Sequence, residues 1–327
     1  MKSEKLLSVQ NLKTHFSVGN SIVKAVDGVS FDLESGKTFA IVGESGSGKS
    51  ITALSIMGLL PNNLSSTDRG KIIFNDQDLT NLEEKEMRKI RGNSISMIFQ
   101  EPMTSLNPVY DLSFQISEAI MLHQNKNKKD ARKIAIEMLD LVGIPEPQKR
   151  IDSFPHELSG GMRQRAMIAM ALSCNPKILI ADEPTTALDV TIQAQIIELM
   201  KELQKKLGMS IIFITHDLGV VSEISDHVMV MYLGNVMEIA ETNELFSNPL
   251  HSYTKSLIDI APQITKEKRK IRLLKGEIPS PINPPSGCVF RTRCPNPTHD
   301  CKNGISTMGL IEPKPGHFVD QCCYECH

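Results

Sequence analysis

The fold is decided by the stretch Gly43-Glu44-Ser45-Gly46-Ser47-Gly48-Lys49-Ser50, which fits the pattern G-x-x-x-x-G-K-[ST] at every fixed position. In such a loop successive backbone N–H groups point inward at phosphate oxygens, and glycine is needed where a side chain would block that approach. Lys49 supplies a positive charge for the β- and γ-phosphates, and Ser50 offers a hydroxyl to Mg²⁺. The stretch therefore predicts a site for a nucleoside triphosphate.

The residues on either side of this loop support the prediction. Thr38–Val42 is a short apolar run between two glycines, which predicts a buried strand. Ile51–Leu60 predicts a helix that Pro61 stops. Strand, loop and helix in that order place an anion against the helix N-terminus. The alternative is a chance Gly/Ser-rich turn, and the flanks and the motifs further along the chain disfavour it.

Composition bounds the class of protein. A chain of 327 residues holds one large domain or two, and 40% hydrophobic residues suffice for a core. A net charge of −2 and the absence of Trp give no sign of nucleic-acid binding. No apolar stretch approaches the ~20 residues of a membrane span, and no apolar segment behind Met1–Lys5 suggests a signal peptide. We therefore expect a cytoplasmic protein that can be peripheral to a membrane.

Periodicity organises the chain into strands and helices. Alternation over Leu7–Phe31, with a turn at Gly19-Asn20, predicts an antiparallel hairpin or meander. A mostly parallel sheet is predicted because helical patterns separate the apolar strands. The clearest helical pattern, Asp189–Leu207, has one apolar stripe and ends before Gly208. The strands of the predicted sheet are Phe39–Val42, Ser94–Phe99, Ile178–Ala181 and Ser210–Ile214.

The middle and the end of the chain differ in character. Residues from about 101 to 154 have helical patterns with polar faces, and Lys126–Lys129 predicts a solvated turn between two helices. Ile264–Pro285 carries the basic run Lys266–Arg272 and then several prolines, which predicts a linker or an extended strap. A small appendage rich in Cys and Pro follows.

An apolar strand ends in two carboxylates at Asp182 and Glu183. Delivering two acids from a buried strand is costly unless a cation or a substrate is present. Asp182 suits the Mg²⁺ shell, and Glu183 suits a general base for an attacking water. A strand that simply ends at a polar loop would be equally common in isolation, but it is a poorer explanation beside a phosphate-binding loop.

The segment Leu158–Arg165, with the sequence LSGGMRQR, predicts a second anion site. Ser159 suits the cap of a helix, and Gly160 and Gly161 leave backbone N–H groups open to an anion. An ordinary Ser-Gly-Gly entry into a helix is the alternative for this segment taken alone.

Taken together, the chain resembles the ATPase subunit of an ABC transporter. The phosphate loop, Gln100, the LSGG signature, Asp182-Glu183, Asp189 and His216 occur in the order of that family. The resemblance implies an α/β fold: a P-loop NTPase cassette with a RecA-like, mostly parallel sheet, an N-terminal antiparallel β subdomain and a helical subdomain at about 101–165. It implies a cassette over residues 1–262 and a Cys-rich C-terminal extension over 263–327.

The family's roles transfer to matching positions. Gln100 corresponds to the Q-loop glutamine that senses Mg²⁺ and water, His216 to the switch histidine, and Asp189 to the D-loop at a dimer interface. Phe16 corresponds to the aromatic residue that stacks on adenine. Taken alone, His216 could be a structural histidine and Phe16 a core residue. The implied catalytic residues are Glu183, His216 and Gln100. Those that bind ATP are Phe16, Gly43, Ser45, Gly46, Ser47, Gly48, Lys49, Ser50 and Ile51. Those that bind Mg²⁺ are Ser50, Gln100 and Asp182; those that bind the partner's ATP are Ser159, Gly160, Gly161 and Gln164.

Within the family, the segments 99–108, 181–191 and 279–295 resemble oligopeptide, dipeptide and nickel importers. This implies an ATPase that energises peptide import through two separate permease subunits, fed by an extracytoplasmic binding protein, at the cytoplasmic face of the membrane. A nickel or metal-chelate importer is one alternative, and a soluble ATPase acting on DNA or ribosomes is another. The subfamily implies a heterodimer with a second ATPase chain in preference to a homodimer.

Six of the seven cysteines lie in the last forty residues, and Cys174 alone suits a packed core residue. The spacing of Cys288, Cys294, Cys301 and Cys322 is wider than in zinc ribbons and favours a [4Fe–4S] cluster, as in some members of the subfamily. Cys323 competes with Cys322 as the fourth ligand. The alternatives are zinc, with His299, His317 or His327 available, and unliganded thiols.

Overall fold

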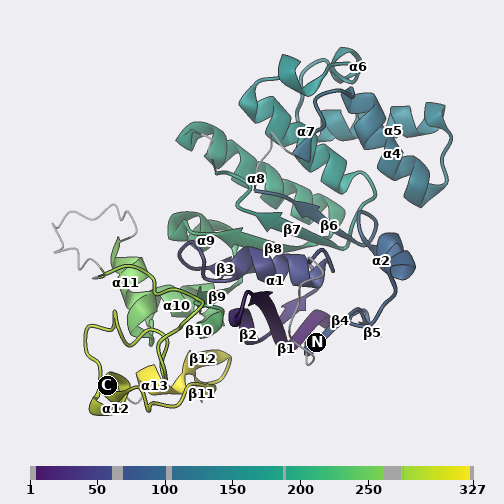
Figure 1. The fold of residues 1–327 in the computed structure, drawn as a ribbon. Coiled ribbons are helices and arrows are strands. Elements are labelled where there is room, and N and C mark those ends of the chain that lie inside the picture. The colour runs from purple at the N-terminus through teal and green to yellow at the C-terminus, as the bar shows by residue number, and fades with distance from the viewer. Residues whose placement is uncertain are drawn as a thin grey trace. The chain divides into compact units, whose positions relative to one another are not determined.

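The computed structural model describes residues 5–60, 69–100, 105–186, 189–260, 274 and 276–324. The chain divides into two compact units (Figure 1). We call the first the signature unit; it holds the described residues of Glu34–Lys37 and Asn81–Ile214. We call the second the loop unit; it holds those of Lys5–Leu33, Thr38–Thr80 and Thr215–His327.

Three parallel strands form the sheet of the signature unit. Ile95 pairs with Ile178, and Ile178 pairs with Ser210, so the predicted parallel pairing is present. Every residue of these strands is buried, as expected for parallel strands covered on both faces. The strands are β6 (Ile95–Ile98), β7 (Ile178–Asp182) and β8 (Ser210–Thr215).

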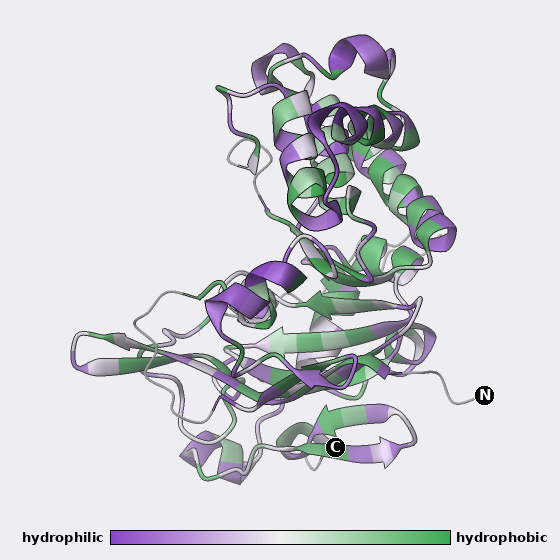
Figure 2. Cartoon of the chain, turned by 90° about the vertical axis from the view of Figure 1, so that its right-hand side faces the viewer, coloured by the Kyte–Doolittle hydropathy of each residue, from purple (hydrophilic) through white to green (hydrophobic). Residues whose placement is uncertain are grey.

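Helices make up most of the rest of this unit. Asp111 and Asn127 cap two of them by accepting bonds from Phe114 N (2.7 Å) and Asp130 N (3.0 Å). Asn125, with φ 52°, ends the first of these helices, so the predicted turn lies just before Lys128. Figure 2 shows that these helices mix hydrophobic and hydrophilic residues. They are α2 (Glu84–Ile90), α4 (Leu112–Gln124), α5 (Lys128–Leu141), α6 (Pro147–Arg150), the 3₁₀ turn Pro155–Glu157 and α7 (Gly160–Leu172).

The longest helix is α8 (Val190–Leu207), close to the predicted bounds. The Asp189 side chain caps its start, and Gly208, with φ 67°, ends it in the left-handed conformation that glycine adopts without strain. Its apolar stripe is buried through Ile196, Met200 and Leu203.

The loop unit begins with an antiparallel sheet in the strand order β2-β1-β4-β5. The predicted hairpin is present, with its turn at Gly19 and Asn20. The strands are β1 (Lys5–Val18), β2 (Ser21–Glu34), β4 (Lys71–Phe74) and β5 (Gln77–Asp78).

The other strands of the loop unit join the start and the end of the chain. β3 (Thr38–Val42) pairs in parallel with β9 (His227–Tyr232), which pairs antiparallel with β10 (Asn235–Glu241). The extension then adds a hairpin, because β12 (His317–Asp320) pairs with β10 and with β11 (Leu310–Lys314). The helices are α1 (Lys49–Ile56), α9 (Leu218–Ile224), α10 (Thr242–Ser247), α11 (Ser252–Ile260), α12 (His299–Asn303) and α13 (Gln321–Tyr324).

The extension shares a hydrophobic core with the rest of the loop unit. Phe290 is fully buried and its ring meets those of Tyr232 and Tyr253 at centroid distances of 5.4 and 5.3 Å. Cys288 and Cys322 belong to the same core cluster. The predicted boundary between residues 262 and 263 and the basic run 266–272 lie outside the described residues.

Among the helices of the described ranges, none is long and apolar enough to cross a membrane.

Candidate functional site

The phosphate-binding loop links β3 to α1 within the loop unit and is shaped by glycines. Gly43 has φ 154° and Gly48 has φ 103°. A Cβ at Gly43 would overlap the carbonyl oxygen of Met231, and one at Gly48 would overlap that of Ala25. Both neighbours are backbone atoms that cannot move aside, so these two positions require glycine for packing as well as for conformation.

The hollow of the loop fits an anion. Gly46 has φ 80°, and no described atom lies within 4 Å of where its Cβ would be. A side chain at this position would occupy the hollow of the loop without clashing with neighbouring residues. The hydroxyl of Ser47 is buried and has no hydrogen-bond partner among the described residues. An open cradle beside an unsatisfied donor is what a bound phosphate group would complete.

Lys49 is the cation of this loop and is 5% exposed. Its Nζ donates to the carbonyl oxygens of Gly43 at 2.8 Å and Glu44 at 3.1 Å. The loop therefore already holds the ammonium over its own backbone. Ser50 and Ile51 follow in the first turn of α1 and are partly buried, whereas Ser45 at the tip of the loop is exposed.

Two other predicted residues lie in the loop unit. Phe16 is on β1 and partly buried, next to His15, whose Nε2 lies 3.0 Å from Asp27 Oδ1. His216 is exposed and follows β8 directly. The next residue, Asp217, caps α9 by accepting from Gly219 N at 2.9 Å. The structure thus presents His216 to solvent on a short, capped connection between a strand and a helix.

In the signature unit, β7 delivers the two predicted carboxylates. Asp182 ends the strand and is 4% exposed. Glu183 has φ 47°, a left-handed conformation that is uncommon for residues other than glycine and that clusters at functional sites. Its backbone N–H donates to Ile214 O at 2.9 Å, which holds the turn against β8.

The carboxylate of Glu183 is oriented by two neutral donors. Gln100 Nε2 and Thr186 Oγ1 each donate to its Oε2 at 3.0 Å. The structure thus brings together two of the predicted catalytic residues, which lie 83 positions apart in the chain. Sequence reasoning missed Thr186, for which the only signal was its place three residues after Glu183.

The signature segment forms the start of α7. Ser159 caps the helix by accepting from Met162 N at 3.3 Å. No described atom lies within 4 Å of a Cβ at Gly160, so this position is open. At Gly161 a Cβ would lie 3.3 Å from Ile192 Cγ2, so this glycine lets α7 approach α8 closely. Of the two glycines, Gly160 is the one that faces open space.

Gln164 lies elsewhere than the resemblance implied. It is fully buried and its Nε2 donates to Pro184 O, so its side chain ties α7 to the segment after Glu183. It therefore does not lie on the open face of the signature with Gly160. Asp189 is also engaged, because it accepts from Ile192 N at 2.9 Å as the cap of α8.

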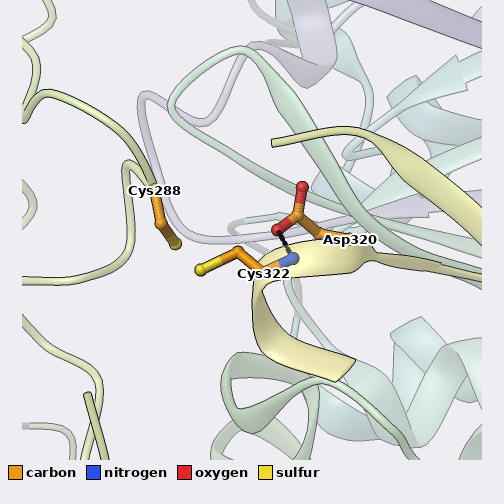
Figure 3. A group of neighbouring side chains, drawn as sticks. All are labelled: Cys288, Asp320 and Cys322. Atoms are coloured by element: carbon orange, nitrogen blue, oxygen red, sulfur yellow. Dashed lines mark hydrogen bonds between the residues drawn. The ribbon is translucent and has the colours of Figure 1, made fainter. Parts of the chain in front are cut away.

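Three of the four cysteines predicted as ligands belong to one buried cluster, and Cys294 packs against it. The close group of possible ligand atoms in the described part of the chain consists of Cys288, Asp320 and Cys322, within 4.8 Å of one another (Figure 3). Cys301 Sγ lies 3.1 Å from Cys322 Sγ but is outside that group, as is Cys294. Asp320 already accepts backbone N–H bonds from Gly309 at 2.9 Å and Cys322 at 3.2 Å.

Burial makes these thiols weak acids. It raises the pKa of Cys288 to about 12, and it raises the pKa of Cys322 as well. In the same way burial raises the pKa of Cys174, whose Sγ contacts Ala119 O at 3.6 Å. These side chains therefore pack as small, neutral, hydrophobic groups.

Comparison with known proteins agrees with the motifs. A family model described as "ABC transporter" matches residues 26–186, and one described as "Oligopeptide/dipeptide transporter, C-terminal region" matches residues 237–301. The oligopeptide transport ATP-binding protein AppD of Bacillus subtilis is 53% identical over 98% of this chain and 97% of its own length. The dipeptide transport ATP-binding protein DppD of Escherichia coli is 49% identical over 94% of this chain and 93% of its own.

Solved structures confirm the predicted fold. The dimeric ATP-binding cassette MJ0796, in a post-hydrolysis state bound to ADP and Pi, covers 72% of this chain and 98% of its own at 27% identity and a TM-score of 0.65. Fold and motifs define an ATPase of the ABC class. The chain belongs, more narrowly, to the ATP-binding proteins of oligopeptide/dipeptide ABC transporters.

The prediction of a [4Fe–4S] cluster is wrong. The relatives that align over nearly the whole chain are ATP-binding transport proteins by name, with nothing to indicate an iron–sulfur protein. The physical reason is visible in the loop unit, where Cys288, Cys301 and Cys322 are buried in the core around Phe290 while Cys294 lies at its edge. Their clustering in sequence reflects packing of the extension.

Proposed function

We propose that this chain hydrolyses ATP in a closed dimer of two cassettes and thereby energises the import of peptides through separate membrane subunits. The observation that carries the hydrolytic part is the pair of donors, Gln100 and Thr186, that orient Glu183. The match of residues 237–301 to the C-terminal region of oligopeptide/dipeptide transporters supports the peptide part.

The loop unit supplies the phosphate site. Backbone N–H groups around Gly46 and the hydroxyl of Ser47 donate to phosphate oxygens, and Lys49 exchanges its loop carbonyls for the β- and γ-phosphates. Mg²⁺ supplies charge neutralisation across those phosphates, and Ser50, Asp182 and Gln100 are its proposed ligands. Phe16 is proposed to stack on adenine, and His216 to contact the γ-phosphate.

The signature unit supplies the chemistry at the water. Glu183 accepts a proton from the attacking water, and Gln100 and Thr186 keep its carboxylate in one orientation. Both donors bond to the same oxygen, Oε2, and so fix the direction in which the carboxylate faces. The strained backbone at Glu183 contributes to the same end, because it aims the side chain from the end of β7.

The signature face supplies the second half of the site to another cassette. Ser159, Gly160 and Gly161 offer donors at the start of α7, and Gly160 faces open space. Asp189 is proposed to lie at the same interface. We expect the partner to be a different ATPase chain rather than a second copy. Co-expression with one neighbouring ATPase and size measurement in the presence of ATP test this.

A groove in the signature unit is proposed to receive the permease. It has a volume of about 480 Å³, and Phe99, which precedes Gln100, is 42% exposed beside it. Contact there would reach the residue that orients Glu183. The lining residues are Gly92, Ser96, Met97, Phe99, Ser105, Ala119, Met167, Met170 and Ala171.

Reconstitution tests the function directly. Membranes that carry this chain, its permeases and an extracytoplasmic binding protein should hydrolyse ATP faster when the binding protein is loaded with peptide. We expect Met170→Glu to abolish that stimulation and Ile305→Glu, an exposed apolar position in the extension, to leave it intact. Recovery of the chain with ribosomes or DNA, and never with membranes at the cytoplasmic face, would contradict the proposal.

Two simple measurements test the substrate and the metal content. Stimulation by a nickel chelate instead of a peptide would favour the alternative importer. Zinc held by the cysteines of the extension, with His299, His317 or His327 available, stays a prediction, and metal analysis of the purified chain tests it.

A further inference from the structure

The extension reaches the phosphate-binding loop through one side chain. Arg293 Nη1 lies 2.6 Å from Glu44 Oε2, and Arg293 Nη2 lies 3.1 Å from Glu44 Oε1. Glu44 is the second residue of the loop, and the two partners are 249 positions apart in the chain. The pairing is bidentate, which gives fixed geometry as well as charge attraction.

Arg293 is itself held rigidly. Its side chain is 5% exposed, and its guanidinium carbon lies 5.8 Å from the centre of the Tyr232 ring. Its backbone N–H donates to Phe290 O at 3.0 Å, and Phe290 is anchored among the aromatic rings of the core. The bonds to Glu44 raise the pKa of Arg293, so the charge is permanent.

Glu44 passes this anchoring on to the loop. Its backbone N–H donates to the Tyr253 hydroxyl at 3.0 Å. Its carbonyl oxygen accepts from Lys49 Nζ at 3.1 Å and from Ser47 N at 3.2 Å. The side chain, the N–H and the carbonyl of Glu44 are therefore all hydrogen-bonded. The carbonyl bonds to Lys49, the cation proposed to bind phosphate.

We infer that Arg293 is a positioning residue for nucleotide binding, which acts through Glu44 on the curl of the phosphate loop and on Lys49. The extension is then a structural part of the nucleotide site. The inference rests on the proposed function, because it needs a chain that binds and turns over ATP. It goes further in assigning a role in that site to a residue that lies beyond the cassette motifs.

The effect expected is on the affinity for nucleotide. Arg293→Met should raise KM for MgATP roughly three- to tenfold, as for a charge-assisted pair whose carboxylate is about one-third exposed. The turnover number should change less, because Glu183, Gln100 and Thr186 are untouched. Arg293→Lys keeps the charge but loses the two-pronged geometry, so its KM should lie between those of the wild type and Arg293→Met.

Arg291 provides the matched control. It lies two residues earlier, and its guanidinium bonds to Lys302 O at 3.1 Å and Ser286 Oγ at 3.5 Å, both within the extension. Arg291→Met should disturb the extension yet leave KM for MgATP within twofold of the wild type. A merely structural role for Arg293 would give the same KM for both variants.

The experiment measures KM and turnover for the full chain, with binding of a fluorescent ATP analogue as a second readout. Glu44→Gln should raise KM like Arg293→Met, and the double variant should be no worse than the poorer single one. Additive losses, or a wild-type KM in Arg293→Met, would overturn the inference. If Arg293→Met does not fold, Arg293→Lys against Arg291→Lys decides in the same way. A wild-type chain without ATP turnover would instead contradict the proposed function.

Discussion

Glu44 lies in the loop after β3 and Glu183 in the turn after β7, but their side chains are held by opposite kinds of partner. The buried guanidinium of Arg293 forms two charge-assisted hydrogen bonds with Glu44. An amide and a hydroxyl, both neutral, orient Glu183. The guanidinium fixes Glu44 by a two-pronged, charge-assisted pair, whereas single neutral hydrogen bonds from Gln100 and Thr186 orient one oxygen of Glu183. We therefore expect Glu44 to act as an anchor and Glu183 as a base.

The largest effect is expected when the carboxylate charge is removed from Glu183 and, in a separate variant, from Glu44. We expect Glu183→Gln to lower ATP hydrolysis roughly 10²–10⁴-fold, the range for loss of a general base, while ATP binding persists. Glu44→Gln makes the same chemical change in the other loop and should lower turnover far less. Phosphate release by the assembled transporter measures both. Equal losses in the two variants would remove the distinction between base and anchor.

The second test removes the cation that the anchor supports. Lys49→Ala should weaken nucleotide binding about 10- to 100-fold, because a charge-assisted contact to phosphate is lost. Titration with a fluorescent ATP analogue measures this. Lys71→Ala, at an exposed position on β4, is the control and should bind like the wild type. Unchanged affinity in Lys49→Ala would mean that the loop is not the phosphate site.

The third test loosens the base without removing it. Gln100→Ala and Thr186→Val each delete one donor to Glu183, so each should lower turnover about two- to tenfold, the value of one hydrogen bond. Affinity for ATP should change less than turnover in Thr186→Val, because Thr186 has no proposed contact with Mg²⁺. A wild-type rate in both variants would show that the orientation of Glu183 does not limit hydrolysis.

The smallest expected effect is on stability. Here Glu44→Gln should have the larger effect, whereas Glu183→Gln has the larger effect on turnover. Glu44→Gln should lower the free energy of unfolding by about 1 kcal/mol, since it weakens a pair whose arginine is buried. That corresponds to a fall in melting temperature of about 2–4 °C. Glu183→Gln should leave the melting temperature within about 1 °C of the wild type, since an amide oxygen can still accept from Gln100 and Thr186. Thermal scans without nucleotide compare the two.

Much of the fold and the site followed from sequence because local chemistry dictates it. The spacing of Gly43, Gly48 and Lys49 is fixed by the needs of a phosphate cradle, and the mostly apolar strand before this loop is buried throughout. Helix α8 was readable from its stripe and from the Gly208 that ends it. The left-handed backbone of Glu183 was not readable, because a residue type other than glycine carries no signal for it.

What sequence could not give are contacts set by tertiary packing. Nothing in the spacing of Arg293 and Glu44 shows that they pair, since the distance along the chain carries no geometry. Gln164 occupies a signature position yet turns inward, because α7 has one face against the core. The cysteines were misread because Cys serves both as a ligand and as a small hydrophobic residue, and spacing along the chain does not separate the two uses.

The bond between Arg293 and Glu44 also has a consequence for how the protein is made. Synthesis runs from the N-terminus, so Glu44 in the phosphate-binding loop emerges 249 residues before Arg293, its partner. A nascent chain on the ribosome therefore lacks the bond between Arg293 and Glu44 until residue 293 has emerged. Chains cut short before residue 293 should therefore bind nucleotide poorly, which makes completion of synthesis a condition for a fully formed site.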